Sequence, residues 1–170
     1  MIDRKRLFPF ILTAGIVMVD QLTKVFIVRY IPFRTIGASF FGDFFRIVHE
    51  RNDGAAFSIG QGLPDAVRFI VFSIIPLIVL AWLIRYIYIS RDLSRRECWS
   101  LAGIAGGGIG NIIDRLFRPE GVVDFFDVKF YGILGMKRWP TFNIADASIV
   151  ACGILFIIFS FVSRKEKTNE

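Results

Sequence analysis

Four long apolar segments constrain what this chain can fold into more than any other feature of its sequence. They cover residues 7–30, 69–88, 99–116 and 142–162. Each is about long enough to cross roughly 30 Å of hydrocarbon as an α-helix. A soluble domain would instead disperse its apolar residues at the period of a helix or strand. Four spans leave little of the 170 residues for anything else, so the sequence predicts one membrane-embedded unit over residues 1–170.

The basic residues gather at the ends of these apolar segments. A net charge of +6 could suggest nucleic acid as a partner, but the positions of the charges fit a membrane protein instead. Short basic flanks stay on the cytoplasmic side of a membrane. The pattern therefore predicts that both termini and the loop between the second and third spans are cytoplasmic. The longer connections, residues 31–68 and 117–141, are then outside, and no nucleic acid partner is expected.

The sequence predicts neither a removable leader nor a bound cofactor. The first segment starts with positive charges, but it is too long for a secretory signal and contains Asp20 and Lys24, so we expect a retained span. The only histidine, His49, has no Cys or His at ligand spacing, which makes a zinc site unexpected. No phosphate-binding loop is present. We therefore expect no metal and no cofactor.

Both outer connections carry strand-like segments. Residues 40–48 are aromatic and β-branched, which favours strands, and residues 122–128 alternate imperfectly. Asn52-Asp53-Gly54 is a turn signal that by itself fits an ordinary hairpin turn. We expect a small β-sheet on the outer leaflet, with an apolar side against lipid headgroups or a lipidated ligand.

Polar residues interrupt the first and third spans. Asp20 and Lys24 lie four apart in the favourable order on a helix, which indicates a structural pair near the outer boundary with Lys24 snorkelling; a direct catalytic role is the alternative. The third span has small-xxx-small pairs that favour close helix packing. These pairs are Gly103 with Gly107 and Gly106 with Gly110. Asn111, Asp114 and Arg115 end this span, and they either support a site or contact a substrate.

Two acidic residues, Asp124 and Asp146, stand beside apolar segments, where carboxylates are costly and persist for a function or a partner. Local sequence alone explains Asp146, because Asn143 could be the N-cap of the last helix with Asp146 at its third position. That interpretation does not account for Asp124. Two neighbouring carboxylates that share a proton can carry out acid–base chemistry.

Five motifs with these residues follow one another along the chain. They are Asp20-Gln21-Leu22-Thr23-Lys24, Asn52-Asp53-Gly54-Ala55-Ala56-Phe57, Gly110-Asn111-Ile112-Ile113-Asp114-Arg115, Val122-Val123-Asp124-Phe125 and Phe142-Asn143-Ile144-Ala145-Asp146. In these motifs and their order the chain resembles the lipoprotein signal peptidases (signal peptidase II), which are aspartyl proteases of the bacterial inner membrane. The stretch between Asp124 and Asp146, which contains residues 131–136, looks slightly long for the family.

The resemblance implies a fold, a reaction and a set of site residues. The fold is membrane all-α with a small β element: four transmembrane helices and an extracytoplasmic β-sheet cradle. The reaction removes signal peptides from diacylglyceryl-modified prolipoproteins just before the lipidated cysteine, with water activated by the catalytic pair Asp124 and Asp146. Residues that bind substrate or support this pair are Asn52, Gly54, Asn111, Arg115 and Asn143. Structural polar support comes from Asp20, Lys24 and Asp114.

The resemblance also implies a location and partners. We expect a multi-pass protein of the bacterial cytoplasmic membrane, a monomer, with its active site near the outer face. Its partners are the lipid-modified prolipoprotein and membrane lipid. The bundle should open sideways to lipid, with residues 40–48 and 55–57 covering the opening. The competing hypotheses are a small proton or ion pathway that uses Asp20, Asp114 and Asp146, and a non-enzymatic membrane scaffold.

Overall fold

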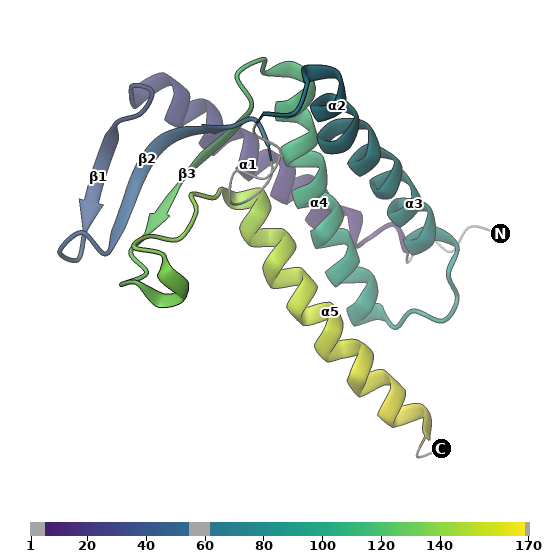
Figure 1. Cartoon of the computed structure of the whole chain (residues 1–170). Coiled ribbons are helices and arrows are strands. Elements are labelled where there is room, and N and C mark those ends of the chain that lie inside the picture. Colours follow the sequence, from purple (N-terminus) through teal and green to yellow (C-terminus); the bar gives the residue numbers. More distant parts are fainter. Residues whose placement is uncertain (1–5, 55–61, 169–170) are drawn as a thin grey trace.

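Helical rods make up most of the computed structural model, which describes residues 6–54 and 62–168 (Figure 1). The first rod is α1 (Phe10–Tyr30), and the second joins α2 (Asp65–Phe69), the π-helix η3 (Ile70–Ile74) and α3 (Ile75–Ile89). The others are α4 (Arg95–Phe117) and α5 (Ile144–Thr168). The π-helical turn ends two residues before Pro76, which has no N–H and would clash with the preceding turn of a regular α-helix.

Three of these rods are long and apolar enough to cross a membrane. They are Phe10–Tyr30, Asp65–Ile89 and Ile144–Arg164, with mean hydropathies of 1.8, 2.6 and 2.3. Few residues of their most apolar windows are buried inside the protein, so their outer surfaces are apolar, as contact with lipid requires. The prediction of helices that are long and apolar enough to span a membrane is confirmed for these three.

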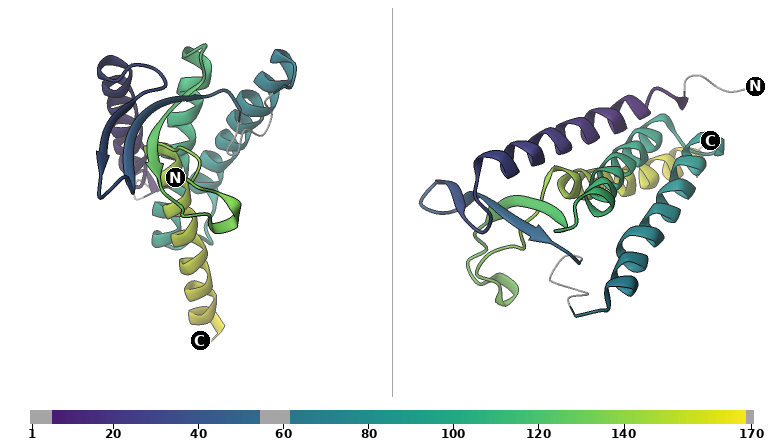
Figure 2. Two further views of the ribbon diagram at one scale, coloured as in Figure 1. Left: turned by 60° about the vertical axis from the view of Figure 1, so that its left-hand side comes forward. Right: turned by 90° about the horizontal axis from the view of Figure 1, so that it is seen from above.

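The remaining rod, α4, differs because it lies at the centre of the bundle. It packs against α1, α3 and α5, as the view from above shows (Figure 2). More than half of its 23 residues are buried. A helix enclosed by other helices can carry polar side chains that a lipid-facing helix could not, and α4 accordingly has a lower hydropathy than its neighbours.

Glycines let the other helices approach α4 closely, as predicted from the small-xxx-small pairs. A Cβ added at Gly106 would stand 3.0 Å from the Cβ of Ile16 on α1. A Cβ added at Gly107 would collide with the carbonyl oxygen of Ala145 at the start of α5. These two neighbouring residues therefore pack α4 against two different helices.

The sheet lies at one end of the bundle, away from the α3–α4 connection and from the end of α5 (Figures 1 and 2). Its antiparallel strands run in the order β1 (Ile36–Phe40), β2 (Phe45–Asn52) and β3 (Val122–Val128). The predicted small sheet is thus present. However, residues 40–48 are not one strand, because Phe41, Gly42 and Asp43 have positive φ and form the β1–β2 turn.

The turn at Asn52-Asp53-Gly54 is not the hairpin turn of this sheet, because β2 pairs with β1 and with the distant β3. The interpretation as an ordinary hairpin turn was therefore wrong for the described strands. The imperfect alternation of β3 also has a cause. Val123, Asp124 and Phe125 are all buried, since the strand is covered on both faces, and Val123 and Phe125 pack with Ile27 of α1.

The segment that leads into α5 is attached to β3. It follows the short 3-10 helix η4 (Ile133–Gly135), which lies between Asp124 and Asp146 in the sequence. The N–H of Phe126 donates to the carbonyl of Phe142 at 2.8 Å, and the N–H of Phe142 donates back at 3.1 Å. This pairing places the first turn of α5 beside the strand that carries Asp124.

Candidate active site

Asp124 and Asp146, which are 22 positions apart in the sequence, line the same cavity of about 710 Å³. Asp124 belongs to β3, and Asp146 belongs to the first turn of α5. The pairing of Phe126 with Phe142 brings these two elements together. Three other predicted site residues also line the cavity, namely Asn52, Asn111 and Arg115.

Asn143 contacts both carboxylates. Its side-chain amide donates to Oδ1 of Asp124 at 2.7 Å, and its backbone N–H donates to Oδ2 of Asp146 at 3.2 Å. In return, the Asp146 N–H donates to Oδ1 of Asn143 at 2.9 Å. This reciprocal pair is a capping arrangement at the start of α5. The capping interpretation of Asp146 is therefore correct, and it is compatible with a position beside Asp124.

Asn111 joins this arrangement from α4. Its amide nitrogen donates to Oδ1 of Asp146 at 2.7 Å. Its amide oxygen accepts from Asn143 at 3.1 Å and from Nζ of Lys24 at 3.1 Å. Both carboxylates are thus held by hydrogen bonds from residues on other elements, which fixes their orientation in the cavity.

A further set of hydrogen bonds at the site involves Asn52, Gly54 and Arg115. The Asn52 amide donates to Oδ2 of Asp124 at 3.2 Å and accepts from the Gly54 N–H at 3.1 Å. Arg115 donates to the Gly54 carbonyl at 3.2 Å. Gly54 therefore contributes to the site through its backbone, which hydrogen-bonds the side chains of Asn52 and Arg115.

The predicted polar support forms one buried cluster. Nζ of Lys24 lies 2.8 Å from Oδ2 of Asp20 and 3.0 Å from Oδ2 of Asp114, and all three side chains are 0% exposed. The prediction that Lys24 snorkels was wrong, because two carboxylates and Asn111 surround it inside the bundle. Asp20 also accepts from the Ala145 N–H at 3.0 Å, and Asp114 accepts from the Val123 N–H at 3.1 Å. The cluster thus ties α1 and α4 to the two segments that carry the cavity carboxylates.

Gln21 is a member of this cluster to which the sequence assigned no role. Its amide donates to Oδ2 of Asp20, to the carbonyl of Gly110 and to Oδ1 of Asp114, at 3.0 to 3.1 Å. A second polar residue directly beside Asp20 within an apolar span was the signal that could have revealed it.

The sequence-based predictions also did not include the apolar walls of the cavity. They come from the segment before α5 and from one side of α5, and they include Trp139, Pro140, Thr141, Phe142, Ala147, Ile149, Val150, Ala151 and Ile154. The prediction that residues 40–48 cover the opening is not confirmed, because none of them is among the described residues that line the cavity. Residues 55–57, the other part of that prediction, lie outside the described residues.

The electrostatics of Asp124 differ from those of an ordinary carboxyl group. Burial, and after it the neighbouring Asp146 carboxylate, raise the pKa of Asp124 to about 7, against hydrogen bonds from Asn52 and Asn143 that lower it. A proton can therefore stay on this carboxyl near neutral pH. Such a pair can act as a general acid and a general base on one bound molecule. No group of three or more His, Cys, Asp or Glu suited to a metal ion occurs in the described part of the chain.

Comparison with known proteins gives a consistent result. The signal peptidase (SPase) II family model matches residues 12–162. The chain is 47% identical over 169 residues to a lipoprotein signal peptidase of Treponema pallidum, covering 99% of this chain and 90% of the relative. It is 46% identical over 169 residues to one of Borrelia hermsii, covering 99% and 98%. A solved bacterial membrane enzyme superimposes with a TM-score of 0.78 at 29% identity, covering 94% of this chain and 91% of that one.

The apolar bundle and its likeness to solved membrane enzymes define the class as a membrane enzyme. Within that class, the chain belongs to the signal peptidase II family, which consists of aspartic proteases.

Proposed function

We propose that this protein removes signal peptides from diacylglyceryl-modified prolipoproteins, cutting just before the lipidated cysteine. The relatives named lipoprotein signal peptidase match almost the whole chain at 46–47% identity, which supports the substrate class. The observation that carries the site assignment is the cavity lined by both Asp124 and Asp146. A proton or ion pathway is less well supported, because the network described above gathers at the sheet end of the bundle and does not extend across it.

In the proposed mechanism Asp124 and Asp146 form the catalytic pair. Close carboxylates do not ionise together readily, so the pair holds one proton, and the raised pKa of Asp124 favours that carboxyl as the resting position. The ionised carboxylate takes a proton from a water molecule, whose oxygen attacks the scissile carbonyl. The protonated carboxyl polarises this carbonyl. A proton then passes to the leaving amine as the C–N bond breaks.

The other predicted residues position this pair. Asn111, Asn143 and Asn52 donate to the carboxylates, so they keep the pair oriented while its proton moves. Arg115 lines the cavity and provides a cation for the carbonyl groups of a bound peptide. The buried cluster of Asp20, Lys24 and Asp114 acts indirectly, by holding Asn111 and the backbone of both segments in place.

The apolar walls of the cavity suit a lipid-modified substrate. Val150 and Ile154 line the cavity and are also 61% and 54% exposed on the surface of α5. A continuous apolar surface therefore leads from the outside of the bundle to the carboxylates. Acyl chains can remain in the bilayer along α5 while the peptide enters, and each buried CH₂ contributes about 0.8 kcal/mol.

We further propose that the whole chain is one monomeric membrane domain with α4 as a fourth span, both termini in the cytoplasm and the sheet outside. The basic flanks of the spans support this orientation. Labelling with a membrane-impermeant maleimide tests it, in a background with both native cysteines replaced by serine. Phe41→Cys in intact cells should react from outside, whereas Asp92→Cys should react only after lysis. The opposite pattern would show that the orientation is inverted.

The cleavage test compares matched substrates. Purified protein in detergent is incubated with a diacylglyceryl-modified prolipoprotein and with the same prolipoprotein lacking the lipid, and mass spectrometry identifies the cut. We expect one cut, directly before the cysteine, and a far higher kcat/KM for the lipidated form. Equal kcat/KM for the two would mean that the lipid is not recognised, and absence of any cut would refute the proposed activity.

A further inference from the structure

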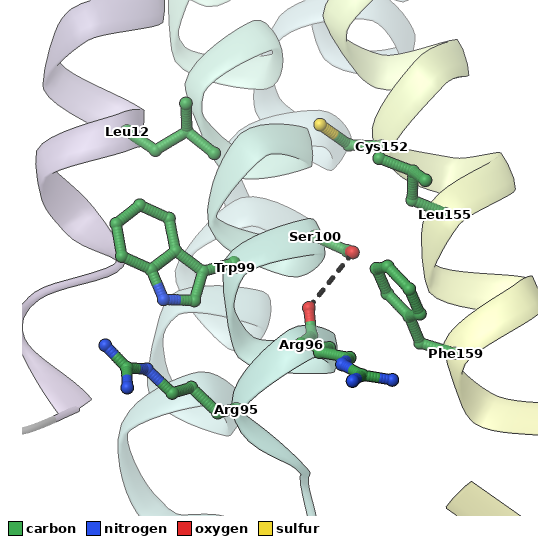
Figure 3. Close-up of a pocket in the computed structure, with 8 residues that line it drawn as sticks. All are labelled: Leu12, Arg95, Arg96, Trp99, Ser100, Cys152, Leu155 and Phe159. Atoms are coloured by element: carbon green, nitrogen blue, oxygen red, sulfur yellow. Dashed lines mark hydrogen bonds between the residues drawn. The ribbon is translucent and has the colours of Figure 1, made fainter. Parts of the chain in front are cut away.

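A second cavity lies near the end of the bundle opposite the sheet. It has a volume of about 290 Å³ and lies between α1, α4 and α5 (Figure 3). Its lining residues are Leu12, Arg95, Arg96, Trp99, Ser100, Cys152, Leu155 and Phe159. None of them belongs to the proposed active site, and the proposed cleavage does not use this cavity.

The two ends of this cavity differ in chemistry. Arg95 and Arg96 lie at the end formed by the first turn of α4, whereas Leu12 and Leu155 lie further into the bundle (Figure 3). Trp99 lies between the arginines and Leu12. An amphipathic ring such as that of Trp is typical of the level at which lipid headgroups meet hydrocarbon. The cavity is therefore cationic at the end formed by the first turn of α4 and apolar towards the middle of the bundle.

Among the described residues, neither arginine of this end forms an ion pair with the neighbouring acid. Within residues 6–54 and 62–168, the Arg95 side chain makes no hydrogen bond or ion pair, and the Arg96 guanidinium lies 5.8 Å from the centre of the Phe159 ring. The acid of this turn, Glu97, does not line the cavity. Its carboxylate accepts from the Ser94 N–H at 2.8 Å and from the Ser160 hydroxyl at 2.9 Å.

We propose that this cavity binds an anionic phospholipid of the cytoplasmic leaflet. Its phosphate would pair with Arg95 and Arg96, since guanidinium groups bind phosphate oxygens in bidentate fashion. The first part of an acyl chain would lie against Trp99, Leu155 and Leu12. Basic pockets between spanning helices on the cytoplasmic side are suited to such headgroups. The orientation proposed above places this end of the bundle at the inner leaflet.

The combination of charge and apolar surface favours a lipid over a soluble anion. A free phosphate would use the two arginines but would leave the apolar half of the cavity without a ligand. A zwitterionic lipid would fill the apolar half, but its own cation would oppose the arginines. Only an anionic lipid matches both halves. Because it contacts three helices at once, its binding should stabilise their packing.

The test measures lipid binding and needs no cleavage assay, so its result is independent of the proposed activity. Protein in detergent is titrated with phosphatidylglycerol, with phosphatidylcholine and with inorganic phosphate, and native mass spectrometry and the melting temperature are recorded. Because two arginines attract the anionic headgroup, we expect phosphatidylglycerol to bind roughly 30-fold more tightly than phosphatidylcholine. Inorganic phosphate alone should not raise the melting temperature. If it reproduces the effect of the lipid, the site binds a free anion and the proposal is wrong.

Matched variants separate the cavity from general attraction to a basic surface. Arg95→Gln/Arg96→Gln should lose the preference for phosphatidylglycerol, and Arg95→Lys/Arg96→Lys should keep part of it. The control Arg85→Gln/Arg91→Gln removes the same charge from exposed residues that do not line the cavity, and it should keep the preference in full. Leu155→Trp retains both arginines but fills the apolar half, so it should weaken phosphatidylglycerol binding. Equal losses in the two glutamine pairs would overturn the proposal.

Discussion

At the scale of single residues, the side-chain amide of Asn111 links the buried cation to the proposed catalytic pair. Lys24 and Asn143 both donate to its oxygen, and its nitrogen donates to Asp146. These partners fix which way the amide points, because neither donor could face the nitrogen. Lys24 thus helps to orient the Asn111 amide, which in turn contacts Asp146. Lys24 acts on Asp146 through this amide.

Asn52 provides a test of the proton held by Asp124. Its hydrogen bond stabilises the ionised carboxylate and so lowers the pKa of Asp124, which burial and the Asp146 carboxylate nevertheless raise to about 7. If the protonated form is the active one, kcat/KM should be retained below pH 7 and should fall as pH rises through about 7. Asn52→Ala removes the stabilisation of the charged form, so the pKa of Asp124 should rise. The alkaline limb of the pH profile should then move to higher pH.

The control for this prediction is Val150→Ala, which also alters the cavity wall. It removes no hydrogen bond from Asp124, so its alkaline limb should coincide with that of the wild type. The profile of kcat/KM is the appropriate measurement because it reports the free enzyme. A limb that stays in place in Asn52→Ala, or that moves to lower pH, would contradict the assignment of the proton to Asp124.

At the scale of elements, the packing of α4 against α5 determines how the site residues on these helices face each other. Gly107→Ala adds a methyl group that collides with the carbonyl of Ala145, one residue before Asp146. Overpacking of this kind costs about 1–3 kcal/mol, and a displacement of about 1 Å in a catalytic group can cost roughly 100-fold in rate. We therefore expect a lower melting temperature and a large loss of kcat.

Gly108 is the matched control on the same helix. A Cβ added there would meet only Leu80 Cδ1, at 3.4 Å, which is ordinary contact. Gly108→Ala should therefore keep both its melting temperature and its activity close to those of the wild type. Similar losses of melting temperature and activity in the two variants would contradict this prediction. They would show that the losses come from helix propensity or general crowding and not from the contact between α4 and α5.

The elements also show what the sequence could and could not predict. Apolar length predicted the helices and β-branched, aromatic composition predicted the sheet, because these signals are local. The pairing of Phe126 with Phe142 has no local signal, yet it brings Asp146 beside Asp124. The burial of Lys24 was missed because two of its partners, Asn111 and Asp114, come from a helix about 90 positions later in the chain.

At the scale of the whole molecule, the two ends of the bundle differ in character. The sheet end holds two hydrogen-bonded carboxylates in a cavity that reaches the exposed apolar side of α5. The opposite end holds two arginines over an apolar pocket. Each end therefore combines charged groups with an apolar surface, which the two proposed ligands, a lipid-modified peptide and an anionic phospholipid, both require.

The central claim is that Asp124 and Asp146 act together in cleavage, and single-turnover kinetics of the two asparagine variants test it most directly. The rate of signal-peptide release from a diacylglyceryl-modified prolipoprotein is measured for the wild type, Asp124→Asn, Asp146→Asn and the double variant, each shown to be folded by its melting curve. Asparagine is nearly isosteric but cannot exchange the proton, so each single variant should lose all detectable cleavage. The double variant should be no worse, because the two residues act as one unit. Substantial turnover in either folded single variant would contradict the account.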